Sequence, residues 1–551
     1  MSKKFGTFGG VFTPSILTIL GVIMYLRLPY IVGQAGLYMT LAIIGIAHII
    51  AITTGLSVAS IATDKKVKAG GTYFMISRSL GLPIGGTLGI ALFVGMSLSI
   101  SLYLIGFSET FLGYWDLPGN KNSIRLTGSI TLGVVALVTI ISTSLAMKTQ
   151  YLIMGAIGLS LATILIGHGD ATIPAAPHLA PLAGAVGFAT LFGIYFPAVT
   201  GFEAGVSMSG DLKDPKKSIP VGTIAAIVVG FIVYVGLAVF LAVRVDADSL
   251  ANDPAVLNSL SFFPPLLMAG IWGATISSAL GSILGAPRIL QATAMDRITP
   301  KFFAKGSGES NEPRNALILT ILLAEAGILI AELDVIARIV SMFFITAYGF
   351  LNISCAVESI VSPDFRPGFR IPRWISFVGA STCVVVMIQL DIVAMMGATM
   401  IMGLMFLYLK RRELTLESGD AYQSIWSSVV RRGLRNLSRT RVHERNWRPN
   451  ILLFSGGEDA RPELVAIARN LAGGRGIVSN VELVETTKPR LRPRSQETPP
   501  ADGPEFDGMF FRRIECENIY EAMQDISRYY GFAGVEPNTV LMGRARRAGQ
   551  A

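Results

Sequence analysis

The chain has 551 residues, of which 51% are hydrophobic and only 15% are charged. Soluble globular proteins carry about 25% charged residues, so this composition argues against a soluble class. The net charge is +9, but no basic patch is interleaved with aromatic residues in the manner that stacks bases. We therefore expect no nucleic-acid partner and look to a membrane.

The composition changes near Lys410, where long apolar stretches give way to dense charge. We expect a membrane domain at residues 1–410, a basic linker with an amphipathic helix at 411–449, and a cytoplasmic α/β domain at 450–551. The three cysteines and four histidines are scattered, and none stands at metal-ligand spacing. No catalytic residue, transition metal or cofactor is expected.

A membrane helix needs about 20 mostly apolar residues. On this criterion the sequence predicts an all-α polytopic membrane protein with twelve transmembrane helices, at residues 11–34, 37–61, 83–114, 125–145, 148–168, 184–209, 219–243, 263–291, 314–332, 335–358, 373–392 and 394–410. Lys and Arg gather in loops that this count places inside the cell, Lys65, Lys66 and Lys68 among them, so both termini are predicted to be cytoplasmic. The expected location is the cell membrane.

Two of these segments are predicted to be broken. The first contains Ile19-Leu20-Gly21-Val22 in its middle, and the sixth contains one proline and two glycines between Pro197 and Gly205. Breaks five helices apart are typical of inverted-repeat transporters, whose half-helix ends face a site at the membrane midplane. Freed amides there can hold anions, and freed carbonyls can hold cations. The alternative is packing alone, because glycine and proline are common in membrane helices.

The region after Arg411 has its own pattern. A run of arginines such as Arg431, Arg432 and Arg435 is expected either to lie against anionic lipid or to belong to a solvated helix. Residues 450–457 predict a buried strand, followed by a helix through Leu471 and a strand near Val481–Val484. Residues 486–508 are rich in Pro, Arg and Glu and predict an irregular loop.

Several long motifs occur in order along the membrane domain. They include Gly21-Val22-Ile23-Met24-Tyr25-Leu26-Arg27-Leu28, Gly70-Gly71-Thr72-Tyr73-Phe74, Phe196-Pro197-Ala198-Val199-Thr200-Gly201 and Gly285-Ala286-Pro287-Arg288. In these motifs the chain resembles the cation-chloride cotransporters, a branch of the amino acid–polyamine–organocation superfamily. The resemblance implies a LeuT-type fold of two inverted five-helix repeats and a homodimer in the lipid bilayer. It also implies symport of Cl⁻ with Na⁺ and K⁺ by alternating access, as in Na-K-Cl cotransporters.

The resemblance also implies ion sites, residue by residue. It assigns sodium to Leu17, Leu20, Ala274, Ser277 and Ser278. It assigns potassium to Thr18, Ile19, Tyr103, Pro197 and Thr200, although the family usually has asparagine where this chain has Thr18. It assigns one chloride to the amides of Gly21, Val22 and Ile23, and a second to those of Gly201, Phe202 and Glu203 with Tyr348. Packing roles for these residues stay open as the alternative.

Glu203 departs from the family pattern, which normally has an apolar residue there. A carboxylate beside a chloride site repels the anion unless it is protonated or paired. Amino-acid permeases of the superfamily often carry a Gly-aromatic-acid sequence at this break, so a Na⁺- or H⁺-coupled amino-acid or polyamine permease is the first alternative. A non-transporting accessory subunit is the second.

Arg27 and Glu109 are predicted to lie in the outer halves of two helices. Charges inside a membrane are costly and usually pair. The family resemblance implies an extracellular gate, and a plain structural ion pair is the alternative.

Overall fold

The computed structural model describes residues 5–64, 70–141, 143–167, 177–207, 212–306, 312–361, 365–411, 421–439, 447–456, 461–473, 475–486, 509–532 and 535–543. The chain divides into two compact units, Met1–Ser424 and Ile425–Ala551. The inner-loop residues Lys65, Lys66 and Lys68 lie outside the described residues, as does the predicted irregular loop from residue 487 onward.

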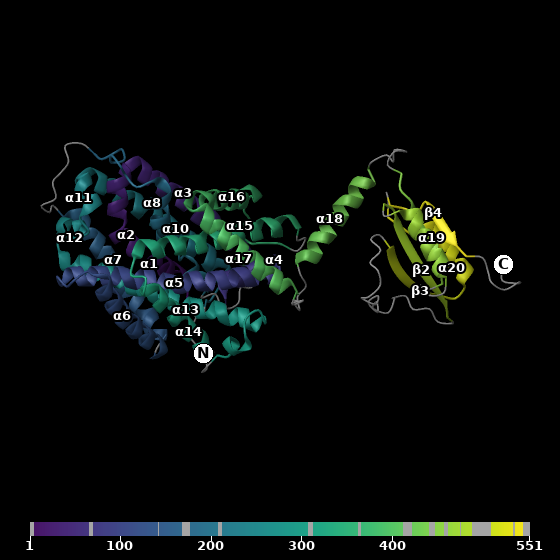
Figure 1. Ribbon diagram of the computed structural model, residues 1–551, viewed down its shortest axis with the longest axis horizontal. Helices are drawn as coiled ribbons and strands as arrows, with labels where there is room; N and C mark the ends of the chain where they lie inside the picture. The colour runs from purple at the N-terminus through teal and green to yellow at the C-terminus, as the bar shows by residue number, and fades with distance from the viewer. Residues whose placement is uncertain are drawn as a thin grey trace. The chain divides into compact units, whose positions relative to one another are not determined.

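The first unit is built of helices (Figure 1). Its elements are η1 (Phe8–Phe12), α1 (Thr13–Ile19), α2 (Val22–Leu26), α3 (Leu28–Asp64), α4 (Gly71–Leu80), α5 (Leu82–Tyr114), α6 (Lys121–Ile141), α7 (Thr143–Ile166), α8 (Phe188–Tyr195), η2 (Phe196–Val199), α9 (Glu203–Ser207), α10 (Pro215–Arg244), α11 (Ala247–Asn252), α12 (Val256–Leu260), α13 (Pro264–Met295), η4 (Lys301–Ala304), α14 (Arg314–Ile328), α15 (Leu333–Val361), α16 (Arg373–Leu390) and α17 (Ile392–Arg411).

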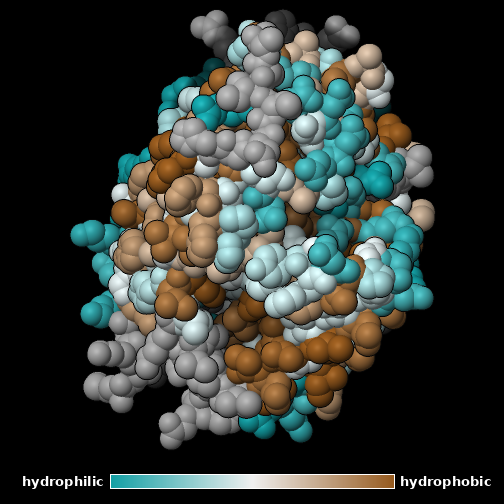
Figure 2. Space-filling model, turned by 90° about the vertical axis from the view of Figure 1, so that its left-hand side faces the viewer, coloured by the Kyte–Doolittle hydropathy of each residue, from teal (hydrophilic) through white to brown (hydrophobic). Residues whose placement is uncertain are grey.

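Nine helices within the described ranges are long and apolar enough to cross a membrane. On α6, Leu126, Ile130, Val134 and Leu137 are all exposed, and their spacing places them on one stripe of the helix. Such a stripe is stable against lipid and costly in water. Figure 2 shows further apolar residues gathered in broad patches beside polar ones. The chain is a helical, multi-pass membrane protein, and the count of twelve spans stays a prediction.

Gly36 separates the first two predicted spans. The helix α3 runs from Leu28 to Asp64, but Gly36 within it has φ 67° and ψ 172°, which is not helical. A Cβ at this position would lie 2.5 Å from the backbone of Ala180. Glycine is required both by the left-handed φ and by this close approach, so the chain can turn here between two helical directions.

The motif at residues 70–81 forms a helix where the sequence indicated an inner loop. α4 begins after Gly70, at φ 97°, and ends at Gly81, at φ 88°. Ten residues are too few to span a bilayer, so a search for long apolar stretches does not detect this element. It places the side chains of Tyr73 and Arg78 against Asp296, which directly follows α13.

The long helices α5 and α13 pack against each other, and α5 also contacts α14 and α15. α3 packs along α10, and α1 contacts both α10 and α13. The short broken segments are therefore held among long helices, and nearly all their side chains are buried. This arrangement positions the candidate site inside the bundle.

The second unit contains a parallel sheet. α18 (Ala421–Leu437) precedes β1 (Asn450–Phe454), α19 (Pro462–Ala472), β2 (Ile477–Glu485), β3 (Met509–Cys516), α20 (Ile519–Tyr529) and β4 (Thr539–Met542), and the strand order is β3-β2-β1-β4. In β1, Ile451 and Leu453 pack with α19, while Leu452 and Phe454 face the side of α20. This alternation covers both faces of the sheet, as a parallel sheet requires.

Candidate ion-binding site

The first helix break lies between α1 and α2. Leu20 has φ −82° and ψ 48°, and Gly21 has φ −93° and ψ −156°, so neither residue is helical. The second break lies between η2 and α9, where Thr200 is extended and Gly201 has a left-handed φ of 91°. Helix ends leave carbonyls and amides without partners inside the helix. Both breaks therefore supply backbone groups that can bind ions.

The two breaks lie against each other. The Ser15 hydroxyl of α1 donates a hydrogen bond of 2.9 Å to the carbonyl of Phe202. A Cβ at Gly201 would lie 2.1 Å from the Thr18 methyl carbon, so only glycine fits there. Segments almost two hundred residues apart in sequence thus form one buried site.

The predicted sodium ligands lie where α13 meets α1. The Ser278 hydroxyl is 3.3 Å from the carbonyl oxygen of Leu17, to which it donates. Ala274 and Ser277 are buried on the same helix, and the carbonyl of Leu20 belongs to the first break. Hydroxyl and carbonyl oxygens are ligands that can replace the hydration shell of an alkali cation.

Two predicted potassium ligands, Thr18 and Tyr103, line one small pocket together with Gly201 and Glu203. The space among these side chains, with the open solvent that it includes, has a volume of about 260 Å³. The hydroxyls of Ser99 and Ser282, 3.0 Å apart, add polar oxygen to its wall.

The other potassium residues are less directly placed. The Thr200 hydroxyl donates to the carbonyl of Pro197 at 2.8 Å, so the two contact each other. The carbonyl of Ile19 accepts a hydrogen bond of 2.7 Å from Tyr234 on α10. Tyr234 was not predicted, because a tyrosine within a long apolar helix gives no signal that it reaches a helix break.

The first predicted anion site comprises Gly21, Val22 and Ile23, at the start of α2. Val22 and Ile23 are buried, with exposed fractions of 0% and 2%. The first amides of a helix have no acceptor within it and favour negative charge.

Among the described residues, no group of three His, Cys, Asp or Glu side chains could hold a metal ion.

The second predicted anion site contains a carboxyl group of the chain itself. The Tyr348 hydroxyl of α15 donates a hydrogen bond of 2.8 Å to Oε2 of Glu203. The rings of Tyr348 and Phe202 lie 5.0 Å apart, and both side chains are fully buried. Oε1 of Glu203 has no hydrogen-bond partner among the described residues.

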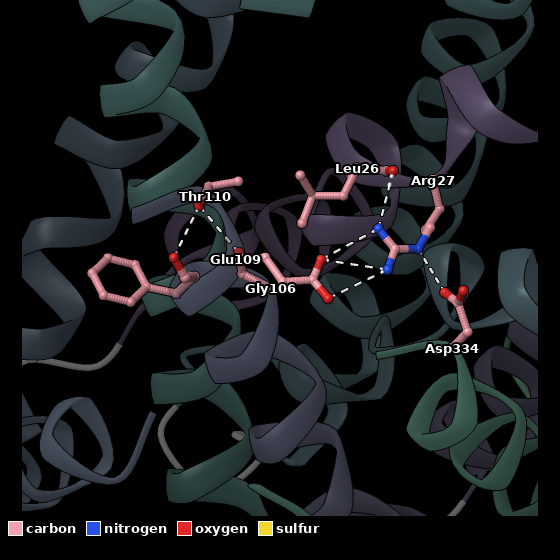
Figure 3. A network of polar contacts seen from close by, with 7 residues as sticks. Leu26, Arg27, Gly106, Glu109, Thr110 and Asp334 are labelled. Carbon is pink, nitrogen blue, oxygen red and sulfur yellow. Dashed lines mark hydrogen bonds and ion pairs between the residues drawn. The ribbon is translucent and has the colours of Figure 1, made fainter. Parts of the chain in front are cut away.

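A third cluster lies at Arg27, directly after α2. Its guanidinium Nη1 is 3.3 Å from Oε2 of Glu109 on α5, and its Nε is 2.6 Å from Oδ1 of Asp334 on α15. Figure 3 shows the guanidinium between the two carboxylates. Asp334 was not predicted, because an acidic residue in the first turn of a helix is typical of a solvated N-terminus. These ion pairs connect the end of α2 to α5 and α15.

Comparison with known proteins gives matches along nearly the whole chain. Residues 10–453 match the family Amino acid permease. The chain is 31% identical to solute carrier family 12 member 2 of Mus musculus over 98% of this chain and 50% of that protein. It is 30% identical to solute carrier family 12 member 1 of Mus musculus over 98% of this chain and 55% of that protein. The chain thus spans about half the length of the curated relatives it matches.

These matches confirm the resemblance to the cation-chloride cotransporters that the motifs indicated. The matched proteins are solute carriers and permeases, which are transporters and not enzymes. A solved structure, that of the Eremococcus coleocola manganese transporter, aligns with a TM-score of 0.48 and 13% identity over 77% of this chain and 95% of that chain. That similarity is low, and the family assignment does not depend on it.

Proposed function

Since the chain belongs to the Amino acid permease family, we propose that it is a secondary active transporter that moves chloride together with sodium and potassium. The observation that carries this proposal is the contact between the two broken helices, which gathers carbonyls, amides and hydroxyls in one buried place. Broken helices that meet inside a bundle are the usual place for substrate and coupling ions in this kind of carrier.

Sodium is proposed to bind between α1 and α13. The contact between Ser278 and the Leu17 carbonyl supports this assignment, because these two oxygens are already within reach of one ion. Ala274, Ser277 and Leu20 would complete the site with backbone or hydroxyl oxygen. The site would couple movement of α1 to α13, which packs against α5.

Potassium is proposed to bind in the pocket between Thr18 and Tyr103. Its size and its several hydroxyl groups suit a partly dehydrated cation. Ile19, Pro197 and Thr200 belong to the same two breaks and would contribute carbonyl oxygen. Chloride is proposed to bind at the amides of Gly21, Val22 and Ile23.

Transport is proposed to follow alternating access across twelve spans arranged as two inverted repeats. The Arg27 cluster would act as the outer gate, because it joins α2 to α5 and α15 and must break if these elements separate. We further propose that the protein works as a homodimer in the cell membrane, with both termini in the cytoplasm.

A second candidate function is an amino-acid or polyamine permease coupled to sodium or protons. Glu203 favours it, because a buried carboxyl at a helix break can receive an amino group or a proton. The limited volume of the pocket favours ions instead.

Ion-omission transport assays test these hypotheses. Purified protein in proteoliposomes is supplied with radiolabelled chloride, sodium or rubidium, and each ion is omitted in turn. Cotransport predicts that removal of sodium abolishes chloride uptake and that removal of chloride abolishes sodium uptake. Chloride-independent uptake of an amino acid or a polyamine would favour the second candidate, and absence of any flux would favour an accessory subunit.

A further inference from the structure

Glu203 is a buried acid whose two carboxyl oxygens have different surroundings. The residue is 1% exposed. Oε2 accepts the hydrogen bond from Tyr348, whereas Oε1 has no partner among the described residues, and the side chain lines the pocket that Thr18 and Tyr103 also line. A buried charged oxygen without a partner is costly, so this oxygen needs a ligand.

Tyr348 is already used as a donor. A tyrosine hydroxyl has one hydrogen to donate, and here that hydrogen points to the carboxyl of Glu203. The ring of Tyr348 packs against those of Phe202 and Phe344, at centroid distances of 5.0 and 5.9 Å. The hydroxyl therefore cannot turn to a chloride ion without first leaving the carboxyl.

The charge of this carboxyl has no basic partner in the pocket wall. Among the described residues that line the pocket, none is Lys, Arg or His. What the wall does offer is neutral: hydroxyl oxygens of Thr18, Tyr103, Ser99 and Ser282, and the backbone amides of Gly201 and Glu203 next to the carboxyl. A negative group beside several neutral oxygens can bind a cation, and it repels a second anion.

We propose that the carboxylate of Glu203 is a built-in anion that takes the place of chloride at the second anion site and is a ligand of the cation bound in this pocket. This inference rests on the proposed cotransport function. The protein then carries one chloride with each sodium, bound at Gly21, Val22 and Ile23, and the second negative charge stays with the chain.

The wild-type protein tests the inference by itself. Initial uptake of radiolabelled chloride and sodium is measured in the same proteoliposomes, together with the dependence of sodium uptake on chloride concentration. We expect about one chloride per sodium and a hyperbolic dependence on chloride, because only one anion site can fill. About two chlorides per sodium with a sigmoidal dependence would overturn the inference.

Removing the negative charge of Glu203 should allow chloride to bind at the second anion site. Two variants, Glu203→Leu and Glu203→Gln, each leave Tyr348 without a charged acceptor. In each variant the number of chloride ions taken up per sodium ion should therefore rise toward about two, and the dependence of sodium uptake on chloride concentration should become sigmoidal. Glu325→Gln is the matched control, since Glu325 accepts a hydrogen bond from Ser129 and is absent from the pocket wall. It should keep the wild-type ratio.

The outcomes separate this inference from the function on which it rests. If neither the wild type nor the variants take up chloride, the cotransport proposal fails first. If either variant transports and keeps about one chloride per sodium, cotransport stands and the role of Glu203 is wrong. Glu203→Gln keeps the shape of the side chain, so it decides the question if Glu203→Leu does not fold.

Discussion

The guanidinium of Arg78 forms a bidentate ion pair with the carboxylate of Asp296, with nitrogen–oxygen distances of 3.1 and 2.9 Å. Tyr73 donates a further hydrogen bond of 2.5 Å to the same carboxylate. Arg78 lies in the last turn of α4, just before α5 begins, whereas Glu109, which pairs with Arg27, lies near the other end of α5. At 1.5 Å per residue a helix of this length is about 50 Å long. Two ion-pair clusters therefore stand at opposite ends of one helix, and both are formed in this structure.

The pair at Arg78 is expected to depend on the shape of guanidinium and not on charge alone. Arg78→Lys keeps the charge but loses one of the two parallel contacts, so the attachment of α4 to the end of α13 should weaken by about 1 kcal/mol. We expect a lower midpoint of thermal unfolding in detergent and slower chloride uptake. A lysine variant with wild-type stability and uptake would show that the bidentate geometry has no role.

The surface pair of Lys121 and Glu332 is the matched control, because both side chains are about half exposed. Lys121 lowers the pKa of the Glu332 carboxyl through its hydrogen bond and its charge. Any stabilisation from this pair is therefore present at neutral pH, above the unfolded-state pKa, and is lost as the pH falls through the lowered pKa. Lys121→Gln at neutral pH should leave stability and uptake unchanged within error.

At the proposed outer gate, we predict that reversing the charges with two substitutions restores little chloride uptake and that a third substitution restores more. Exchanging the charges with Arg27→Glu and Glu109→Arg keeps that pair, but it places the new carboxylate beside Asp334, which is 2.6 Å from Arg27 in the wild type. Like charges so close repel, so the double variant should recover little uptake. Adding Asp334→Asn removes the repulsion.

Chloride uptake and surface expression measured for each variant decide this prediction. The triple variant should recover several times more uptake than the double variant. Full recovery in the double variant would mean that Asp334 does not act with this pair.

The sequence predicted where the two helices break, but it did not predict which distant residues contact the segments around the first break. Leu20 and Gly21 lie where glycine within an apolar stretch predicted an interruption, and the second break lies between Pro197 and Gly205. Asp334 and Tyr234 were missed, because each contacts a residue more than two hundred positions away. Hydrophobic periodicity reports one helix at a time and carries no information on such contacts.

Short elements were missed for a different reason. α4 is too short for a membrane span, and α20 exposes most of its side chains, so neither contains a long apolar stretch. In α20 the packed residues include Met523 and Ile526, which lie against buried side chains of the sheet. The helical conformation of α20 therefore depends on tertiary packing and on the side-chain cap at Asn518 more than on amino-acid composition.

Within the proposed sodium site, the hydroxyl of Ser278 contacts the backbone of α1. Ser278 contacts the Leu17 carbonyl at 3.3 Å, so Ser278→Ala should raise the sodium concentration for half-maximal uptake by about tenfold or more, equivalent to ~1.4 kcal/mol. Sodium titration of chloride uptake measures this shift. Thr275→Val on the same helix is the control, because the Thr275 hydroxyl bonds to Trp272 of its own helix. Equal shifts in both variants would point to damage to α13 and not to a lost ligand.

Tyr103 should matter for potassium more than for sodium. It is 3% exposed and lines the pocket with Thr18 and Glu203, so Tyr103→Phe removes one oxygen from the proposed cation site and keeps the packed ring. We expect the rubidium concentration for half-maximal uptake to rise by about tenfold, while that for sodium changes by less than about twofold.

Tyr195→Phe is the control, because Tyr195 also has a buried hydroxyl without a hydrogen-bond partner among the described residues, and it is not part of the pocket wall. That change should leave both ion affinities unaltered, and it should not lower stability, since it removes an unsatisfied buried group. If Tyr103→Phe weakens sodium and rubidium equally while Tyr195→Phe weakens neither, the hydroxyl acts on the whole cycle and the potassium assignment is wrong.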